Sequence, residues 1–145
     1  MHRIALDADI VPWQGLGNIK LYATLDALHP IVADKRTKKF AYHKNLVRYE
    51  VPGKLYLFFN LVNGKLFKLT ALHGYRGALF GRIRMGMQME TVLRIDNSFS
   101  YDAFEEVYYS PKGVYIETDA ECNTVQWISV FIRELERADF EEGNW

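Results

Sequence analysis

The stretch GVYIETD, residues 113–119, alternates in the way that a β-strand with one buried face alternates. Val114, Ile116 and Thr118 fall on one face, because successive side chains of a strand point to opposite sides. The other face carries a tyrosine and two carboxylates. The stretch therefore predicts one side for a core. The second side is a solvated surface, an acid/base site or a surface for another protein.

The composition is that of one ordinary domain. The chain has 145 residues, of which 49% are hydrophobic and 14% aromatic, enough to build its own core. Cys122 is the only cysteine, so no intramolecular disulfide can form. The first twenty residues hold neither a basic segment followed by an apolar run nor about 18 consecutive apolar residues. We therefore expect one soluble, cytoplasmic domain, residues 1–145.

The formal net charge of zero hides a division of charge along the chain. Residues 1–73 hold 11 Lys and Arg against 5 Asp and Glu, whereas residues 74–145 hold 7 against 13. The two halves thus carry formal charges of +6 and −6. A field of one sign steers oppositely charged molecules toward its side, so this division predicts a charged partner.

The sequence is similar to itself at two offsets. At an offset of 59, residues 51–72 align with residues 110–131. At an offset of 64, residues 17–28 align with residues 81–92. Such self-similarity predicts an internal duplication within one domain. The two repeats are expected at approximately 17–72 and 81–133.

Each repeat is predicted to contain one short helix and three strands joined by tight turns. We expect a further opening strand at residues 3–10 and a loop in the basic stretch 33–45. The predicted fold class is α+β, an antiparallel sheet built from two degenerate helix-plus-three-strand repeats with the helices on one face. The expected helices are Thr24–Ala33 and Gln88–Ile95, and the expected strands are Leu46–Val51, Lys54–Leu61, Lys65–Leu72, Phe104–Ser110, Gly113–Thr118 and Thr124–Arg133.

Residues suited to catalysis or metal binding are scattered. Cys122 lies in a predicted turn, and the four histidines lie in four different segments. The usual spacings of metal-binding His and Cys residues are absent from the sequence, so we expect neither a metal nor another cofactor. Paired carboxylates can hydrolyse glycosides, but alternation places Glu117 and Asp119 on an open face rather than in an apolar pocket. A small enzyme of unknown reaction is therefore an alternative only.

The basic run DKRTKKFAYHK, residues 34–44, has the composition of a nucleic-acid contact. Its cations can neutralise phosphates, and Phe40 and Tyr42 can stack on bases. A solvated loop explains the same run, and the acidic second half would repel a polyanion. Nucleic-acid binding through residues 35–44 is thus the first alternative, ahead of a small enzyme. We expect neither a membrane nor a small molecule as partner.

Extending the register of residues 113–119 across both repeats gives an outer face that is too apolar for water and too polar for a core. Aromatic side chains with a few fixed charges are typical of interface centres. The competing interpretation is that the opening strand, or the acidic segment ending at Trp145, covers this face. The expected outer residues are Tyr56, Phe58, Asn60, Leu66, Lys68, Thr70, Leu72, Tyr115, Glu117, Asp119, Val125, Trp127, Ser129 and Phe131.

Two resemblances bear on function. The segment GMQMETVL, residues 86–93, resembles the opening and helix of the small repeat in bacterial β-lactamase-inhibitor proteins and lipoprotein assembly factors. Residues 75–138 as a whole resemble small bacterial immunity proteins encoded beside polymorphic or contact-dependent growth-inhibition toxins. The second resemblance implies a non-enzymatic protein that tightly binds and blocks one cognate toxin, often a nuclease. It implies no shared set of functional residues.

These observations together predict an immunity protein that neutralises a toxin domain, expected to be a basic nuclease, through an acidic and aromatic surface. Carboxylates that take the place of phosphates speed association and exclude the toxin's substrate. The expected charges are Asp102, Glu105, Glu106, Glu117, Asp119 and Glu121, and the expected aromatic anchors are Tyr109, Tyr115, Trp127 and Phe131.

Overall fold

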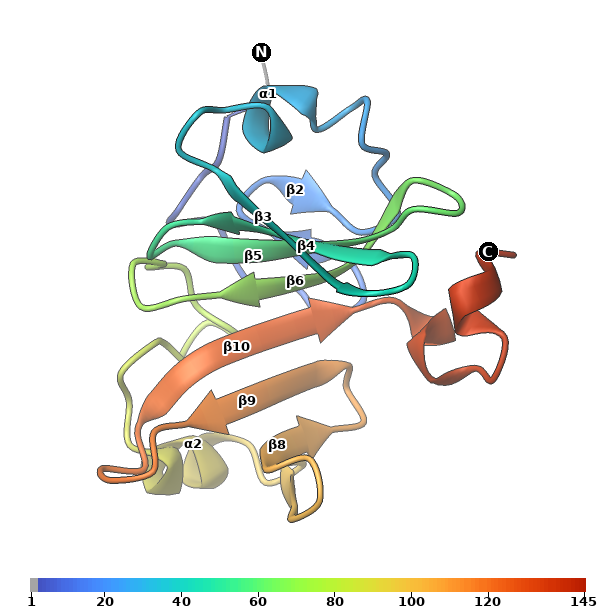
Figure 1. The fold of residues 1–145 in the computed structure, drawn as a ribbon. Coiled ribbons are helices and arrows are strands. Elements are labelled where there is room, and N and C mark those ends of the chain that lie inside the picture. The colour runs from blue at the N-terminus through green and yellow to red at the C-terminus, as the bar shows by residue number, and fades with distance from the viewer. Residues whose placement is uncertain (1–2) are drawn as a thin grey trace.

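An antiparallel sheet of eight strands forms most of the molecule in a computed structural model that describes residues 3–145 (Figure 1). A hairpin of two very short strands, β1 (Gly15–Leu16) and β2 (Ile19–Lys20), lies behind this sheet. The strands of the large sheet are β3 (Lys38–His43), β4 (Leu46–Val51), β5 (Leu55–Asn60), β6 (Lys65–Ala71), β7 (Ser100–Asp102), β8 (Val107–Ser110), β9 (Val114–Thr118) and β10 (Val125–Phe131).

The strand order of the large sheet is β3-β4-β5-β6-β10-β9-β8-β7, so each half of the chain supplies one half of the sheet. Both halves run in chain order from an outer edge to the centre, where β6 pairs with β10. The six strands expected between residues 46 and 133 are all found, with ends that differ by at most three residues. Their alternation was therefore a sound guide to the secondary structure.

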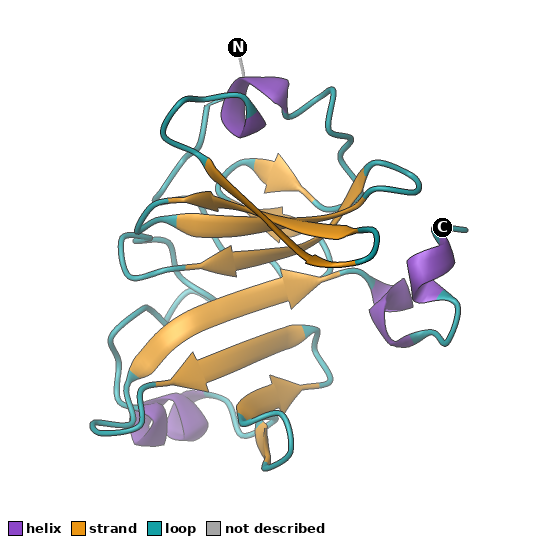
Figure 2. Ribbon diagram, viewed as in Figure 1, coloured by secondary structure: helices purple, strands orange, loops and turns teal. Residues whose placement is uncertain are grey.

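The predicted α+β class is wrong, because the fold is mostly β (Figure 2). Its two α-helices are α1 (His29–Val32), a single turn, and α2 (Met89–Ile95). The helix expected at Thr24–Ala33 is short because its first residues join the sheet instead: Thr24 bridges Lys65, and the Leu25 N–H donates to the Gly64 carbonyl. Two 3-10 helices follow β10, namely η1 (Arg133–Glu136) and η2 (Phe140–Glu142).

Two further expectations are wrong. The segment 3–10 is not a strand, although its Ile10 N–H donates to the Ala78 carbonyl and its Leu6 carbonyl accepts from Arg76 and Gly77. The basic stretch 33–45 is not all loop, because it contains β3 at one edge of the sheet. All six residues of β3 are exposed, and lysines on such an edge discourage further strands from pairing with it.

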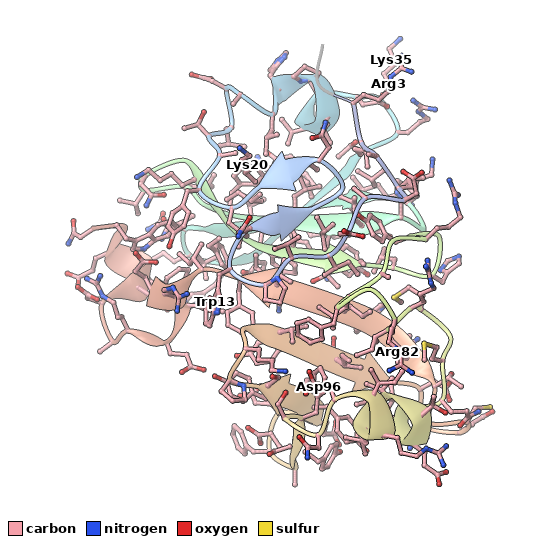
Figure 3. The ribbon with its side chains drawn as sticks, turned by 180° about the vertical axis from the view of Figure 1, so that it is seen from behind. Arg3, Trp13, Lys20, Lys35, Arg82 and Asp96 are labelled. Atoms are coloured by element: carbon pink, nitrogen blue, oxygen red, sulfur yellow. The ribbon has the colours of Figure 1, made fainter. Side chains whose placement is uncertain are left out.

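The hydrophobic core lies on the inner face of the sheet. Leu57 and Leu69 of one half and Ile116 and Ile128 of the other are fully buried in one cluster. This cluster also includes residues of β1, β2, α1 and α2, and Figure 3 shows the β1–β2 hairpin lying over the back of the sheet. One continuous core therefore joins both halves. In the described range, no helix combines the length and apolarity needed to cross a bilayer.

Two β-bulges change the register that alternation predicts. On β6, Phe58 faces Lys68 while Phe59 faces Leu66, which leaves Phe67 as an extra residue. On β10 the same shift between Val125 and Trp127 leaves residue 126 extra. An extra residue moves the following side chains to the opposite face.

Leu66 and Val125, both expected on the outer face, are consequently buried in the core. The extra residues 67 and 126 are 59 apart, which is the offset found in the sequence. An internal duplication would place two bulges at equivalent positions in this way. The division into repeats itself stays a prediction.

The central pair of strands generates a first test. Leu69 is fully buried on β6, so Leu69→Ala should lower the free energy of unfolding by about 2–5 kcal/mol through lost burial and a residual cavity. Leu61→Ala, at a side chain that is 44% exposed, is the matched control and should change it by less than about 0.5 kcal/mol. Urea unfolding measures both. Equal effects of the two substitutions would contradict this placement of the core.

Candidate functional site

The outer face of the large sheet carries a row of polar and aromatic residues from edge to edge. Paired residues of neighbouring strands share a face, so the strand register defines this row directly. The C-terminal segment covers one end of this face, where Phe140 packs on Phe67 and its carbonyl accepts from the Asn60 amide. From β3 to β7 the row is Lys38, Glu50, Tyr56, Thr70, Ser129, Tyr115, Tyr109 and Ser100.

A pocket of about 480 Å³ opens on this face where the two halves of the sheet meet. Strands β6, β8, β9 and β10 form its floor, and the β7–β8 hairpin and η1 form its walls. Four carboxylates and one ammonium line it, a formal charge of −3. We call it the acidic pocket, and its lining residues are Lys68, Asp102, Glu105, Val107, Tyr109, Tyr115, Glu117, Ser129, Leu135 and Glu136.

Lys68 is the one cation of the acidic pocket. Its Nζ lies 4.8 Å from the ring centroid of Phe58 and 5.8 Å from that of Tyr115. Within residues 3–145 it forms no ion pair, since no carboxylate oxygen lies within 4.0 Å. Burial lowers the pKa of Lys68, and the charges of Glu117 and Glu105 oppose that change. The ammonium is therefore held by aromatic faces and a diffuse acidic field rather than by one partner.

Glu117 lies beside Lys68 and is half-buried. Burial raises the pKa of Glu117, and the nearby Lys68 charge lowers it only in part. Burial thus disfavours the charged form of both groups, which fits their separation beyond ion-pair distance. A ligand that brought a positive charge close to Glu117 would relieve part of this desolvation cost.

Tyrosines form the apolar part of the acidic pocket. The Tyr115 ring stacks on Phe131 at 4.5 Å between centroids and contacts Tyr109 at 5.4 Å. Burial, followed by the charge of Glu136, raises the pKa of Tyr115 to about 12. Its hydroxyl therefore stays protonated at neutral pH and can both donate and accept a hydrogen bond.

The β7–β8 hairpin places an apolar side chain beside these charges. The Asp102 carboxylate accepts hydrogen bonds from the backbone N–H of Phe104, at 2.9 Å, and of Glu105, at 3.1 Å. These bonds shape a tight turn in which Glu106 takes a positive φ of 58°. The Phe104 side chain is left 91% exposed at the tip. An aromatic ring this exposed beside a pocket has the character of an interface anchor.

The structure brings together five of the ten site residues expected from the sequence: Asp102, Glu105, Tyr109, Tyr115 and Glu117. The other expected residues lie outside the acidic pocket. Glu106 and Glu121 are exposed in two different turns. Trp127 packs against Tyr56 with ring centroids 6.2 Å apart, and Phe131 is buried beneath Tyr115.

Asp119 has a structural task instead. Its carboxylate accepts from the backbone N–H of Glu121 and Cys122 and from the Thr124 hydroxyl, at 2.6 Å for the last. The Thr124 hydrogen bond, followed by the backbone ones, lowers the pKa of Asp119. Asp119 thus holds the turn between β9 and β10. Its carboxylate oxygens already accept hydrogen bonds from groups of the same turn.

Sequence reasoning did not assign Lys68, Phe104, Leu135 or Glu136 to the site. Lys68 was expected on the outer face, and as the only cation there it was a visible signal. Phe104 stands between Asp102 and Glu105 in a stretch that holds several other aromatic residues, which is a weaker signal. No local pattern predicts that Leu135 and Glu136 of η1 fold back beside β9. Across the described residues, no three His, Cys, Asp or Glu side chains gather closely enough to hold a metal.

Comparison with known proteins identifies no family for this chain. No protein-family model matches the sequence, and no curated protein matches it. Among solved structures, a cysteine-rich secretory protein from Staphylococcus aureus subsp. aureus Mu50 superposes with a TM-score of 0.51 at 9% sequence identity. The match covers 88% of this chain and 49% of that one, so the chain spans about half the length of this neighbour. A likeness at this identity concerns the fold alone.

The coupling between Lys68 and Glu117 can be measured. By carbon-detected NMR titration, Glu117 should show a pKa above its ordinary value of 4.5, because burial outweighs the attraction of Lys68. In Lys68→Met the pKa should rise further, since the opposing charge is gone. Because the pKa of Glu117 is higher in the folded protein than in the unfolded chain, its ionisation lowers the free energy of unfolding at pH values above the raised pKa. This loss of stability is absent below pH 4.5, where Glu117 is protonated in both states. A pKa of Glu117 that falls in Lys68→Met would contradict this arrangement.

Proposed function

We propose that this protein is a non-enzymatic binding module whose acidic pocket holds basic side chains of a protein partner. One observation carries the proposal: four carboxylates and a single ammonium line a pocket, and the hairpin that forms one of its walls exposes a phenylalanine. A guanidinium or ammonium from a partner matches this charge and can contact the aromatic rings of Tyr109 and Tyr115.

The rim favours a protein over a small cation as ligand. Phe104 and Tyr101 are exposed on the same hairpin, at 91% and 55%, and a small ion in the pocket would leave both in water. Aromatic residues next to fixed charges are where binding free energy concentrates in protein interfaces. A partner that inserts a basic side chain and covers this hairpin uses both features.

Lys68 gives the pocket selectivity. Two cations repel at close range, so a bound basic side chain is directed away from Lys68 toward the outer carboxylates of Glu105 and Glu136. Specificity often depends on such a repulsive element as well as on attraction. Lys68 therefore excludes partners that would place a positive charge at the pocket floor.

Binding is favoured over catalysis by the surroundings of Glu117. A catalytic acid for glycoside hydrolysis needs an apolar pocket that keeps it protonated near neutral pH. Glu117 instead faces Lys68, whose charge lowers the pKa that burial raises. The excess of carboxylates over ammonium groups in the acidic pocket suits a site that stabilises the positive charge of a ligand.

The partner that we propose is a basic toxin domain, expected to be a nuclease. The resemblance of residues 75–138 to bacterial immunity proteins supports a toxin as the partner. The formal charge of −6 on residues 74–145 supports a partner with a basic surface. A nuclease presents a basic surface to phosphates, and carboxylates that occupy this surface block its substrate.

A basic peptide tests the pocket without the partner. Binding of fluorescent hexa-arginine, followed by anisotropy, should weaken by up to about thirtyfold in the double variant Glu105→Gln/Glu136→Gln, because each exposed ion pair contributes about 0.2–1 kcal/mol. The matched control is Glu121→Gln/Glu142→Gln, which removes the same charge from exposed positions outside the pocket and its walls. It should leave affinity within about twofold. Equal losses in both variants would show general attraction and no pocket.

A growth assay tests the toxin separately. Cells that produce the C-terminal domain encoded by the gene immediately upstream should survive with the wild-type chain and die with Glu105→Gln/Glu136→Gln. A harmless upstream product would contradict the toxin, while hexa-arginine binding would still report on the pocket. Protection that survives the pocket variant, and disappears when Lys35, Arg36, Lys38 and Lys39 become glutamine, would favour nucleic-acid binding by the basic stretch.

A further inference from the structure

A second pocket, of about 740 Å³, lies at the opposite end of the molecule from the acidic pocket. In Figure 1, α1 marks its end of the fold and β8 marks the other. Its walls are the segment 3–6, α1 with the turn that follows it, and the turn between β4 and β5. We call it the basic pocket, and its lining residues are Arg3, Ile4, Leu6, Pro30, Ile31, Asp34, Arg36, Thr37, Val51, Pro52 and Lys54.

The floor of the basic pocket is aliphatic. Ile31 belongs to the hydrophobic core, and Ile4, Leu6 and Val51 pack against that core while remaining partly exposed. The wall is fixed by hydrogen bonds of the turn after α1: the Thr37 hydroxyl donates to the Ile31 carbonyl at 2.8 Å. An apolar floor held in this way is a built surface, and its volume lies in the range of about 300–1,000 Å³ typical of small-molecule sites.

The rim of the basic pocket carries unbalanced positive charge. Arg36 is neutralised by Asp34, whose two carboxylate oxygens each accept from the guanidinium at 3.1 Å. Arg3 and Lys54 have no such partner, as neither forms an ion pair in the described part of the chain. Figure 3 shows Lys35 and Arg3 at the same end of the molecule. The local field is therefore positive above an apolar floor.

We propose that the basic pocket binds an organic anion with an aliphatic body, of the class of medium-chain fatty carboxylates. The carboxylate pairs with Arg3 and Lys54 at the rim, and the chain lies on Ile4, Leu6 and Ile31. The charge selects an anion, and the aliphatic floor selects a hydrocarbon body over a nucleotide or sugar. This ligand differs from the expectation, drawn from the sequence, that no small molecule binds. It is independent of the proposed protein partner, which uses the other end of the fold.

Decanoate is the probe for a first experiment on the intact chain. Calorimetry should detect saturable binding of decanoate and much weaker binding of 1-decanol, which has the same chain length and no charge, so that the acidic pocket does not attract it. Amide NMR shifts caused by decanoate should fall on residues 3–6, 30–37 and 51–54. Equal binding of both amphiphiles, no saturable binding of decanoate, or shifts confined to other segments would overturn the proposal.

Variants of the rim complete the test. Arg3→Gln/Lys54→Gln should weaken decanoate binding by about tenfold or more, because each removed cation leaves the carboxylate with one charged donor fewer. Lys20→Gln, at an exposed lysine outside the basic pocket, is the matched control and should leave decanoate affinity unchanged. The double variant should also bind hexa-arginine as the wild type does. Undiminished decanoate binding by the double variant would refute the assignment of Arg3 and Lys54.

Discussion

The pairing of β6 with β10 is the interaction on which the rest of the structure depends. Thr70 and Ser129 face each other across this pair, and their buried hydroxyls hydrogen-bond at 2.7 Å. The pair joins the two halves of the chain into one sheet, so that a single core is shared between them. It also sets Lys68 of the basic half, residues 1–73, opposite Phe131 of the acidic half, residues 74–145. The acidic pocket exists because this seam brings a lysine from one half among carboxylates from the other.

The same arrangement separates the remaining charges toward opposite ends of the molecule. Residues 1–73 carry +6 and residues 74–145 carry −6, and each half occupies its own half of the sheet. The basic pocket is lined entirely by the first half, whereas the acidic pocket takes only Lys68 from it. A net charge of zero therefore coexists with two pockets whose lining residues carry opposite formal charge, at opposite ends of the molecule.

Sequence reasoning predicted what depends on local alternation and missed what depends on tertiary placement. The six expected strands that are found, β4, β5, β6, β8, β9 and β10, follow from alternation and turn residues, whereas β7 was not expected. Tyr115 and Glu117 were correctly placed on the outer face. The bulges that bury Leu66 and Val125 were not predicted, because an extra residue leaves no mark in the pattern. The edge strand β3 was mistaken for a loop, because its lysines give it the composition of a loop. The acidic pocket needs η1 to fold back beside β9, and no local pattern specifies that contact.

Native-state hydrogen exchange tests most directly the claim that the β6–β10 pair makes the two halves one cooperative unit. The free energies of opening should agree within about 1 kcal/mol between amides of the β4–β5 pair and amides of the β8–β9 pair, and both should match global unfolding. A lower free energy of opening for the whole of β8 and β9 would mean that the acidic half unfolds alone. That result would contradict the shared core and, with it, a preformed acidic pocket.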